Sequence, residues 1–472
     1  MAYPNTVPRR TSDVMNTLLK RILLRISELS NIVLIMIPFA IAWHSVYAPR
    51  TIAPFFHRGH WVVLVLYALV YLTYNRVYDG FRVSLNRVST IIMSQFLSAL
   101  ISDGILFLVI WLLTRDFPPV MPMAVVLIAQ AILSAIWSWI SYIWYFHTFS
   151  ARPTAIIYDQ KYDLESLISQ YGLERKFHVV ASCDVSSALA DGLSVLNDVE
   201  VVFLCGIHSH ERNIILKRCV ARGIRLYLMP RIGDVLMSGA QQVHLFHLPI
   251  LKVTRYNPPP EYLFIKRLMD IAICGIAAVI LLPVMAVVAI AIKATDGGPV
   301  FYKQRRLTKD GKIFNVLKFR SMRVDAEKDG VARLSTGEND DRITPVGRFI
   351  RKCRLDELPQ LFNILSGSMS IVGPRPERPE IAAQYEQELP EFSLRLQAKA
   401  GLTGYAQVYG KYNTTPYDKL QMDLMYIANP SILADLKIMF ATVKVLFQAE
   451  STEGVSEQQT TALSKTEHSK IC

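Results

Sequence analysis

The chain has 472 residues, of which 51% are hydrophobic and 19% are charged. Its 51 Lys and Arg against 39 Asp and Glu give a formal net charge of +12 at pH 7. A soluble nucleic-acid-binding protein of this charge would be richer in Lys and Arg and poorer in apolar residues, and a disordered chain would also hold fewer apolar residues. Six scattered cysteines without a CxxC pair indicate neither a zinc site nor a disulfide framework. The composition indicates a basic membrane protein of about two to four domains.

Four apolar segments crowd the first 150 residues. They cover residues 31–47, 60–74, 91–114 and 120–149, and each approaches or exceeds the roughly 20 residues that a membrane-spanning helix needs. All six tryptophans fall in this region, partly at segment ends, where interfacial aromatic residues belong. Buried helices of a soluble core are the alternative, but four such runs in succession favour an α-helical membrane bundle over residues 1–149.

The charges between these segments predict their orientation. Basic residues are concentrated in the leader before residue 31 and in the connection 75–90, whereas the other two connections carry few. Short cytoplasmic loops are enriched in Lys and Arg. We therefore expect both ends of the bundle, and the start of the chain after it, on the cytoplasmic side of the membrane.

A fifth apolar run covers residues 268–292 and differs from the first four. Pro283 lies in its middle, and basic residues flank it on both sides. A straight spanning helix would place one positive flank on the wrong side of the membrane. Because proline removes a backbone donor and breaks or kinks a helix, we favour a re-entrant hairpin that enters and leaves by the same face.

Residues 150–257 have the pattern of a soluble α/β domain. Short β-rich runs at 154–158, 178–181, 199–205 and 225–229 alternate with expected helices such as 163–171 and 210–222, which predicts a parallel, Rossmann-like sheet. No glycine-rich phosphate loop follows the first strand, so a structural, oligomerising or regulatory role is favoured over nucleotide binding. Pro258–Pro260 predicts the boundary to the next domain, over residues 258–448.

The third region contains a basic helix followed by two adjacent acids. Thr344 and Pro345 predict a helix start, with an apolar stripe of Val346, Phe349, Ile350 and Cys353 and arginines on its other faces. Such a helix also suits contact with anionic lipid. Asp356 and Glu357 are expected in the first turn of the next helix, where the helix dipole would keep them ionised. They could hold a divalent metal with phosphate oxygens; ordinary helix capping is the alternative.

A short strand is expected at residues 369–373, followed by Pro374-Arg375-Pro376. The two prolines would stiffen this loop and fix the direction of Arg375, which suits recognition of a phosphate group. A surface turn without such a role is the alternative.

Together these motifs resemble the bacterial sugar transferase family, the monotopic phosphoglycosyl transferases. The resemblance covers residues 261–448 and rests on motifs in this order: Lys266-Arg267 with Asp270, the Pro283 break, Gly298–Phe301, Lys318–Met322, Leu355–Asn363, Val372–Pro376 and Gly401–Gly404. It implies an α+β monotopic catalytic domain with the re-entrant hairpin. With the bundle and the α/β domain, the chain is similar to the long members that initiate capsule and exopolysaccharide synthesis in the bacterial cytoplasmic membrane.

The resemblance also implies a reaction. A sugar 1-phosphate passes from a UDP-sugar to polyprenyl phosphate through a covalent phosphosugar–aspartate intermediate, with release of UMP and with Mg²⁺ as cofactor. Asp356 would be the nucleophile and a magnesium ligand, and Glu357 would assist and bind the same metal. The expected phosphate- or substrate-binding residues are Lys318, Arg351, Arg375 and, from a less specific motif, Asp435. A homodimer is a further expectation, and no residue identifies the sugar.

Two other functions fit the sequence less well. An inactive scaffold or regulator of polysaccharide assembly need not keep the Asp356-Glu357 pair with Arg375, and a transporter would carry more charge inside its apolar segments than Asp103 and Asp270. Residues 434–448 are expected to form an amphipathic helix on the cytoplasmic leaflet, and the polar segment 449–472 is expected to be a disordered tail.

Overall fold

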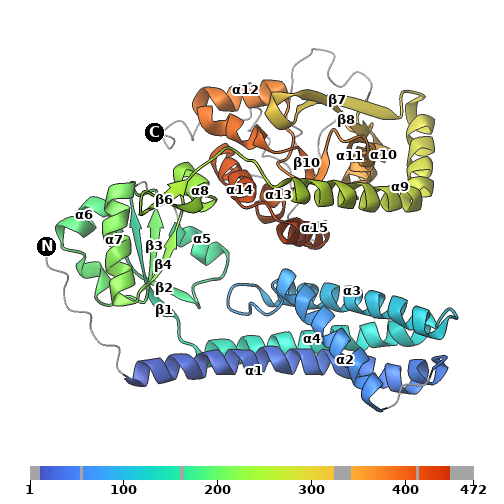
Figure 1. Ribbon diagram of the computed structural model, residues 1–472, viewed down its shortest axis with the longest axis horizontal. Coiled ribbons are helices and arrows are strands. Elements are labelled where there is room, and N and C mark those ends of the chain that lie inside the picture. The colour runs from blue at the N-terminus through green and yellow to red at the C-terminus, as the bar shows by residue number, and fades with distance from the viewer. Residues whose placement is uncertain (1–10, 54–56, 160–163, 324–341, 411–413, 447–472) are drawn as a thin grey trace. The chain divides into compact units, whose positions relative to one another are not determined.

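The computed structural model describes residues 11–53, 57–159, 164–323, 342–410 and 414–446. Its contacts divide the chain into two compact units, Met1–Met229 and Pro230–Cys472 (Figure 1). The first unit holds a helical bundle and a parallel sheet, and the second holds a mixed α and β fold. The expected tail at 449–472 lies outside the described residues.

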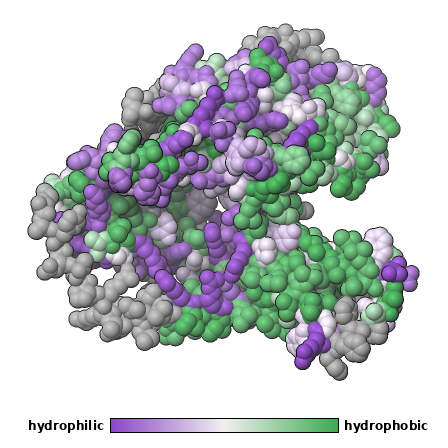
Figure 2. Space-filling model, viewed as in Figure 1, coloured by the Kyte–Doolittle hydropathy of each residue, from purple (hydrophilic) through white to green (hydrophobic). Residues whose placement is uncertain are grey.

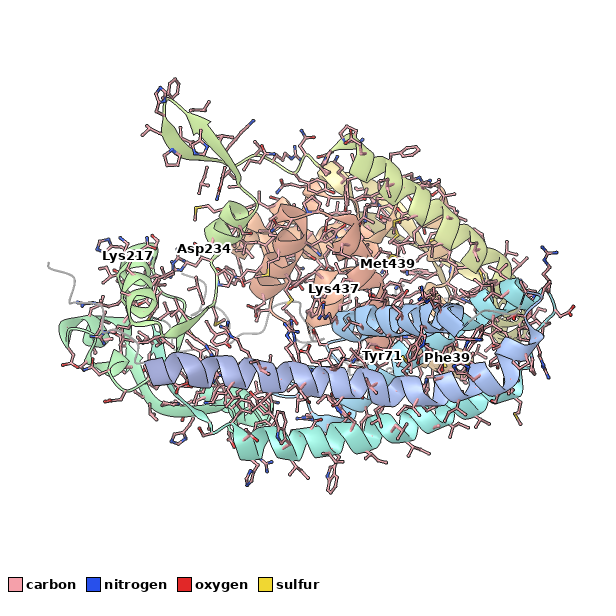
Figure 3. All side chains as sticks on the ribbon, turned by 60° about the horizontal axis from the view of Figure 1, so that its bottom comes forward. Phe39, Tyr71, Lys217, Asp234, Lys437 and Met439 are labelled. Carbon is pink, nitrogen blue, oxygen red and sulfur yellow. The ribbon has the colours of Figure 1, made fainter. Side chains whose placement is uncertain are left out.

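The bundle consists of α1 (Thr11–Ala42), α2 (His57–Val77), α3 (Val88–Thr114) and α4 (Val120–Thr148). These helices confirm the four predicted helical segments, although α1 begins well before residue 31. Phe39 and Tyr67 stack inside the bundle with ring centroids 4.4 Å apart, and Phe39 and Tyr71 lie between its helices (Figure 3). Its outer surface is broadly hydrophobic (Figure 2).

Four of the described helices are long and apolar enough to cross a membrane. They are α1 with its continuation to Arg50, α3, α4 and α9 (Pro260–Asp296). Helix α2 does not meet the same combination of length and apolarity, because its two ends carry histidine and arginine. The N-terminal bundle is therefore that of a membrane protein, while the spanning role of α2 stays a prediction.

A four-stranded parallel sheet follows the bundle. It contains β1 (Arg152–Tyr158), β2 (Phe177–Asp184), β3 (Val201–Cys205) and β4 (Arg225–Leu228) in the order β2-β1-β3-β4. The connecting helices are α5 (Leu164–Gln170), α6 (Val185–Ala190) and α7 (Ser209–Arg222). The predicted alternation of strands and helices and the parallel sheet are confirmed. Helix α6 was not predicted, because its six residues are too few for a clear period.

The segment before α9 belongs by its contacts to the second unit. Helix α8 (Ile232–Ser238) packs on α14 (Pro416–Ala428), and the side-chain amide of Gln421 donates to the Pro230 carbonyl. A hairpin of β5 (Gln241–Leu245) and β6 (Leu248–Lys252) follows. The compact unit therefore starts near residue 230, whereas the prolines at 258–260 suggested a boundary about 28 residues later.

Helix α9 runs from Pro260 to Asp296 with Pro283 inside it. Figure 1 shows a sharp bend part way along this helix, and proline explains the bend because it removes one helical hydrogen bond. Before Pro283, Cys274 belongs to the main core of the unit. After it, Met285 and Ile292 pack in a separate cluster with Phe319. The bend thus lets one helix cover two cores, and many of its remaining apolar side chains are exposed.

The rest of the second unit wraps around the buried face of α9. Its strands are β7 (Phe301–Leu307), β8 (Ile313–Phe319), β9 (Ser370–Val372) and β10 (Gly401–Thr403). Its helices are α10 (Pro345–Lys352), α11 (Gln360–Leu365), α12 (Pro379–Glu388), α13 (Tyr405–Tyr409), α14 and α15 (Ile432–Leu446), with 3₁₀ segments η6 (Leu355–Glu357) and η7 (Pro390–Gln397). The predicted strand at 369–373 and the predicted helix at 434–448 are confirmed with shifted ends.

Candidate active site

Lys318 reaches the site from β8, which pairs antiparallel with β7. The side chain of Asn363 fixes this strand: its Oδ1 accepts from the Leu317 amide at 2.8 Å, and its Nδ2 donates to the Asn315 carbonyl at 2.9 Å. A single side chain on α11 therefore binds β8 at two backbone groups, one and three residues before Lys318. This contact ties the strand that carries Lys318 to the helix that follows the two acids.

The two acids lie in their own 3₁₀ turn, η6, and not in the first turn of α11. Pro359 separates them from α11, which has only six residues. The expectation that both acids lie in the first turn of the next helix is therefore wrong, and the dipole of α11, whose effect falls off within its first turn, is not what keeps them ionised. Arg354, just before the turn, has a left-handed backbone with φ of 54°, and non-glycine residues adopt that conformation mainly at sharp turns and functional sites.

Helix α10 begins as predicted, but only part of its predicted apolar stripe is buried. The Thr344 hydroxyl accepts from the Gly347 amide at 3.0 Å and caps the helix. Ile350 is buried, but Phe349 and Cys353 are exposed, so the stripe is only partly a packing face. Arg351, in the last turn, lies close enough to Asp356 to lower the pKa of that carboxyl.

Arg375 follows β9 in a loop between prolines, as predicted. Strand β9 pairs parallel with β10, and the Asp270 carboxylate of α9 accepts from the Ile371 amide at 3.0 Å. The Gly373 amide donates to the Thr403 carbonyl at 2.9 Å. The loop thus leaves a strand that is held on both sides, and this fixes where Arg375 begins.

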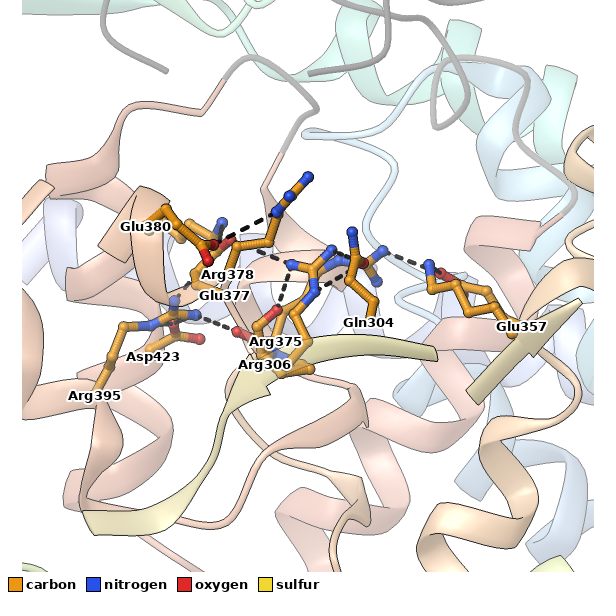
Figure 4. A network of polar contacts seen from close by, with 12 residues as sticks. Gln304, Arg306, Glu357, Arg375, Glu377, Arg378, Glu380, Arg395 and Asp423 are labelled. Atoms are coloured by element: carbon orange, nitrogen blue, oxygen red, sulfur yellow. Dashed lines mark hydrogen bonds and ion pairs between the residues drawn. The ribbon is translucent and has the colours of Figure 1, made fainter. Parts of the chain in front are cut away.

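The structure brings three of the predicted site residues into direct contact. Arg375 Nη2 donates to Glu357 Oε1 at 3.0 Å, and Lys318 Nζ lies 3.4 Å from the same oxygen (Figure 4). The exposed fractions of the side chains are 39% for Arg375, 20% for Lys318 and 19% for Glu357. Two cations and a carboxylate therefore meet at a partly open place beside Asp356.

The environments of the two acids separate their pKa values. Burial raises the pKa of Asp356, and the positive charges of Lys318 and Arg351 offset this only in part. For Glu357, burial also acts to raise the pKa, but Arg375 and Lys318 outweigh it and lower the value to about 2. Neighbouring titratable groups with diverging pKa values mark distinct chemical roles. Glu357 is a permanently ionised partner of the cations, and Asp356 is the less stabilised, more basic carboxylate.

Asp435 lies in a different cluster. Its carboxylate, 2% exposed, accepts hydrogen bonds from Tyr262 at 2.9 Å and Tyr426 at 2.8 Å and pairs with Lys266 at 2.9 Å. This cluster joins α9, α14 and α15. Among the described residues, Asp435 makes no hydrogen bond or ion pair with Lys318, Glu357 or Arg375, so its predicted role in substrate binding stays a prediction.

A second group of charges lies behind the Arg375 loop and was not predicted as part of the site. It comprises Arg306 on β7, Glu377 in the loop, Arg395 in η7, and Lys419 and Asp423 on α14 (Figure 4). No local sequence pattern marks these residues, because what distinguishes them is their burial in the folded protein. The side chains of Arg395 and Asp423 are 2% and 1% exposed.

The acids fit a magnesium ion only in part. The described residues contain no group of three or more His, Cys, Asp or Glu side chains placed to hold a metal. Mg²⁺ is commonly bound through one or two carboxylates, with water and substrate phosphates completing the octahedron. Asp356 and the adjacent Glu357 lie beside Lys318 and Arg375, so these two carboxylates would be the ones to hold the ion, with substrate phosphates as further ligands.

Known proteins are similar to the region that contains Lys318, Asp356, Glu357 and Arg375. The family described as Bacterial sugar transferase matches residues 261–449. The UDP-N-acetylgalactosamine-undecaprenyl-phosphate N-acetylgalactosaminephosphotransferase of Aeromonas hydrophila is 38% identical over 49% of this chain and 54% of its own length. The UDP-glucose:undecaprenyl-phosphate glucose-1-phosphate transferase of Escherichia coli (strain K12) is 40% identical over 44% of each chain.

A shorter relative is matched over most of its length. The putative undecaprenyl-phosphate N-acetylgalactosaminyl 1-phosphate transferase of Bacillus subtilis (strain 168) is 46% identical over 34% of this chain and 83% of its own length. The matches to the two longer relatives span about half of those proteins. The family match includes Lys318, Glu357 and Arg375, the shorter relative is matched over most of its length, and the chain belongs to the bacterial sugar transferase family.

Proposed function

We propose that this protein transfers a sugar 1-phosphate from a UDP-sugar to polyprenyl phosphate and releases UMP. The observation that carries the proposal is the contact of Lys318 and Arg375 with Glu357 beside Asp356, within the region that matches the family. The relatives' names specify undecaprenyl phosphate and UDP-sugars for those proteins. For this chain the same pair of substrates is the proposal, as the first membrane step of capsule or exopolysaccharide synthesis.

The proposed chemistry is two in-line displacements. An oxygen of Asp356 attacks the β-phosphorus of the UDP-sugar, the bond from that phosphorus to the bridging oxygen breaks, and UMP leaves with the electron pair. An oxygen of polyprenyl phosphate then attacks the phosphorus of the acyl phosphate, and the Asp356 carboxylate is regenerated. A carboxylate nucleophile divides one displacement into two easier ones.

The neighbouring residues supply positive charge where negative charge develops. Lys318 and Arg375 are held at the site by their shared partner Glu357, and Arg351 lies near Asp356. Such fixed cations stabilise the transition state more than mobile solvent does. Mg²⁺ held by Asp356 and Glu357 would neutralise pyrophosphate charge. Asp356 must be ionised to attack, and its raised pKa makes it more nucleophilic once it has lost its proton.

We further propose that α9 is a re-entrant hairpin and that the catalytic region lies on the cytoplasmic face of the bacterial inner membrane. Its bend at Pro283, its exposed apolar side chains such as Val279 and Val287, and the basic residues on both flanks support this topology. The strand order β2-β1-β3-β4 supports a Rossmann-like assignment for the α/β domain. A homodimer stays a prediction.

The decisive experiment combines Asp356→Asn with mass spectrometry. The purified protein, given a panel of UDP-sugars and polyprenyl phosphate, should release UMP with at least one of them. Asp356→Asn should lower the rate by about 10³-fold or more, because an amide is a poor nucleophile. With the UDP-sugar alone and an acid quench, the wild-type protein should gain one phosphosugar on the peptide that contains Asp356.

Asp310→Asn is the matched control, since Asp310 is an exposed acid whose ion pair within the described part of the chain is with Arg255. It should release UMP at the wild-type rate. Transfer at a near-normal rate by folded Asp356→Asn would exclude covalent catalysis at this residue. Absence of UMP release with every UDP-sugar would instead favour a scaffold or a transporter.

A further inference from the structure

The loop that carries Arg375 is held through its backbone. Three successive carbonyls each accept one hydrogen bond of 2.9 Å: that of Arg375 from Arg395 Nη2, that of Pro376 from Arg306 Nη1, and that of Glu377 from the Leu307 amide. In most loops, backbone carbonyls form hydrogen bonds with water instead. Here the donors come from β7 and η7, which lie 70 residues before and 20 residues after the loop.

The two arginines that donate to the loop are themselves fixed by carboxylates. Arg395 pairs with Asp423, with Nη2 to Oδ2 at 2.6 Å and Nε to Oδ2 at 2.8 Å, and its Nη1 lies 3.5 Å from Glu377 Oε1. Arg306 Nη1 lies 3.8 Å from Glu377 Oε2, and Lys419 contacts the same carboxylate. Each guanidinium thus bridges a carboxylate and a backbone carbonyl, which a planar fork of donors allows and a single ammonium does not.

Glu377 and both arginines remain charged at neutral pH, whereas burial raises the pKa of Asp423 in spite of the neighbouring Arg395. Burial acts to raise the pKa of Glu377, but Lys419, Arg395 and Arg306 outweigh it and lower the value to about 2. Burial lowers the pKa of Arg306 to about 10, although Glu377 opposes that shift. Figure 4 shows the resulting chain of contacts from Asp423 through Arg395 and the loop to Glu357.

We propose that Arg306 and Arg395 are positioning residues that hold the Arg375 backbone so that its guanidinium points at Glu357 and the reacting phosphates. Neither arginine needs to touch a substrate for this role. The inference deepens the proposed transferase function and rests on it. It identifies the buried charges behind the loop as the support of one phosphate-binding side chain, with Asp423 and Glu377 as the anchors.

The test is a double-mutant cycle on UMP release by the full-length protein in nanodiscs. Arg395→Lys and Arg306→Lys keep the charge but remove the fork, so each should lower kcat about 10- to 100-fold, the loss expected when a catalytic group is displaced by about 1 Å. KM should change less than about threefold. In an Arg375→Ala background, the same lysine substitutions should lower kcat by less than about twofold, because the group they position is absent.

Arg305→Lys is the control, since Arg305 is the exposed neighbour of Arg306 on β7; its kcat should equal that of the wild type. Equal losses from Arg395→Lys in both backgrounds would overturn the proposal, as would a normal kcat in folded Arg395→Lys when Arg375→Ala is impaired. If Arg395→Lys does not fold, Arg306→Lys carries the same comparison. A wild-type kcat in Arg375→Ala would instead remove the role of Arg375 from the proposed function.

Discussion

At the scale of single residues, the two adjacent acids differ more than their sequence suggests. Asp356 and Glu357 occupy the same 3₁₀ turn, yet only Glu357 shares an oxygen with two cations. The pKa of Glu357 is lowered to about 2, while that of Asp356 is raised by burial. This contrast supports the proposed roles, in which Glu357 holds the cations in place and Asp356 reacts with the substrate.

The first prediction concerns the pH dependence of the rate. The proposed mechanism needs ionised Asp356, so activity should be lost as pH falls through the pKa of this carboxyl. Arg351→Gln removes one of the charges that lower that pKa, so the acidic limb of kcat/KM against pH should move to higher pH. The exposed Arg348 on the same helix gives the control Arg348→Gln, whose limb should not move. A limb unchanged in Arg351→Gln would exclude Asp356 as the titrating group.

The second prediction concerns stability. Because the folded-state pKa of Asp356 is raised above its ordinary value, ionised Asp356 destabilises the fold; this cost is present above the folded pKa and vanishes as pH falls below the unfolded pKa. Asp356→Asn should therefore raise the midpoint of thermal unfolding at pH 7 by about 1–3 °C. The gain should shrink at acidic pH. A lower midpoint at pH 7 would show that Asp356 supports the fold.

At the scale of elements, a close approach of two backbones forms the base of the Arg375 loop. Gly373 and Gly401 lie side by side where β9 leaves β10: a Cβ on Gly401 would be 2.1 Å from the Gly373 amide nitrogen and 2.5 Å from the Thr403 carbonyl oxygen. These neighbours are backbone atoms, so they cannot move aside as a flexible side chain could. The Gly401 amide also donates to the Pro374 carbonyl at 2.9 Å.

Gly401→Ala should therefore destabilise the second unit by about 3 kcal/mol or more, at the upper end of the cost of overpacking. It should also lower UMP release, because the strand pair directs the Arg375 loop. Gly233→Ala is the matched control: a Cβ there meets nothing within 4 Å, and alanine in helix α8 should change stability by less than about 1 kcal/mol. Thermal unfolding of the wild type and of the two variants measures the stability changes. Equal stability of the two variants would contradict the backbone contact.

The bend in α9 gives a prediction about membrane topology. In a cysteine-free background, single cysteines at Tyr262 and Tyr302 should both resist an impermeant thiol reagent on the periplasmic side. A cysteine at Phe117, exposed in the connection between α3 and α4, should react. Pro283→Ala restores a helical hydrogen bond and favours a straight helix, so labelling at position 302 should increase. Labelling of only one of the first two positions with Pro283 intact would exclude the re-entrant hairpin.

At the scale of the whole molecule, the chain consists of two compact units, and all of the grouped site residues lie in the second. The start of this unit at Pro230 adds α8 to the region that matches the family. Val235 of α8 belongs to its main core, and a Cβ on Gly239 would lie 2.4 Å from the Ala428 carbonyl oxygen. Helix α8 is therefore part of the support of α14, which carries Asp423 and Lys419.

A fragment from Pro230 to the C-terminus should release UMP within about tenfold of the full-length rate, since the site is built from its own residues. A fragment from Asn257 should keep some activity but unfold at a lower temperature, because it lacks the packing of α8 on α14. Activity and thermal unfolding in nanodiscs measure both fragments. A folded but wholly inactive Pro230 fragment would show that the first unit contributes to catalysis.

The sequence by itself determined the elements and the family. Apolar runs, the Thr344 cap, the alternation at 150–229 and the prolines around Arg375 are local signals that depend on a few neighbouring residues. The helices and strands they predict are found, although α1 begins about 20 residues earlier than expected. The ordered motifs at 266–404 likewise sufficed to place the chain in its family, and they contained Lys318, Glu357 and Arg375 before their contact was known.

Only the tertiary structure decided which of these residues meet and in what charge state. Lys318 and Arg375 reach Glu357 across 39 and 18 residues, and Arg395 reaches the Arg375 carbonyl across 20; no local pattern reports such distances. The family resemblance implied that Asp435 binds substrate; the structure shows its carboxylate held by Tyr262, Lys266 and Tyr426, and the role stays a prediction. The charge state of Asp356 likewise depends on the tertiary structure, because its pKa is determined by burial and by charges that folding brings together.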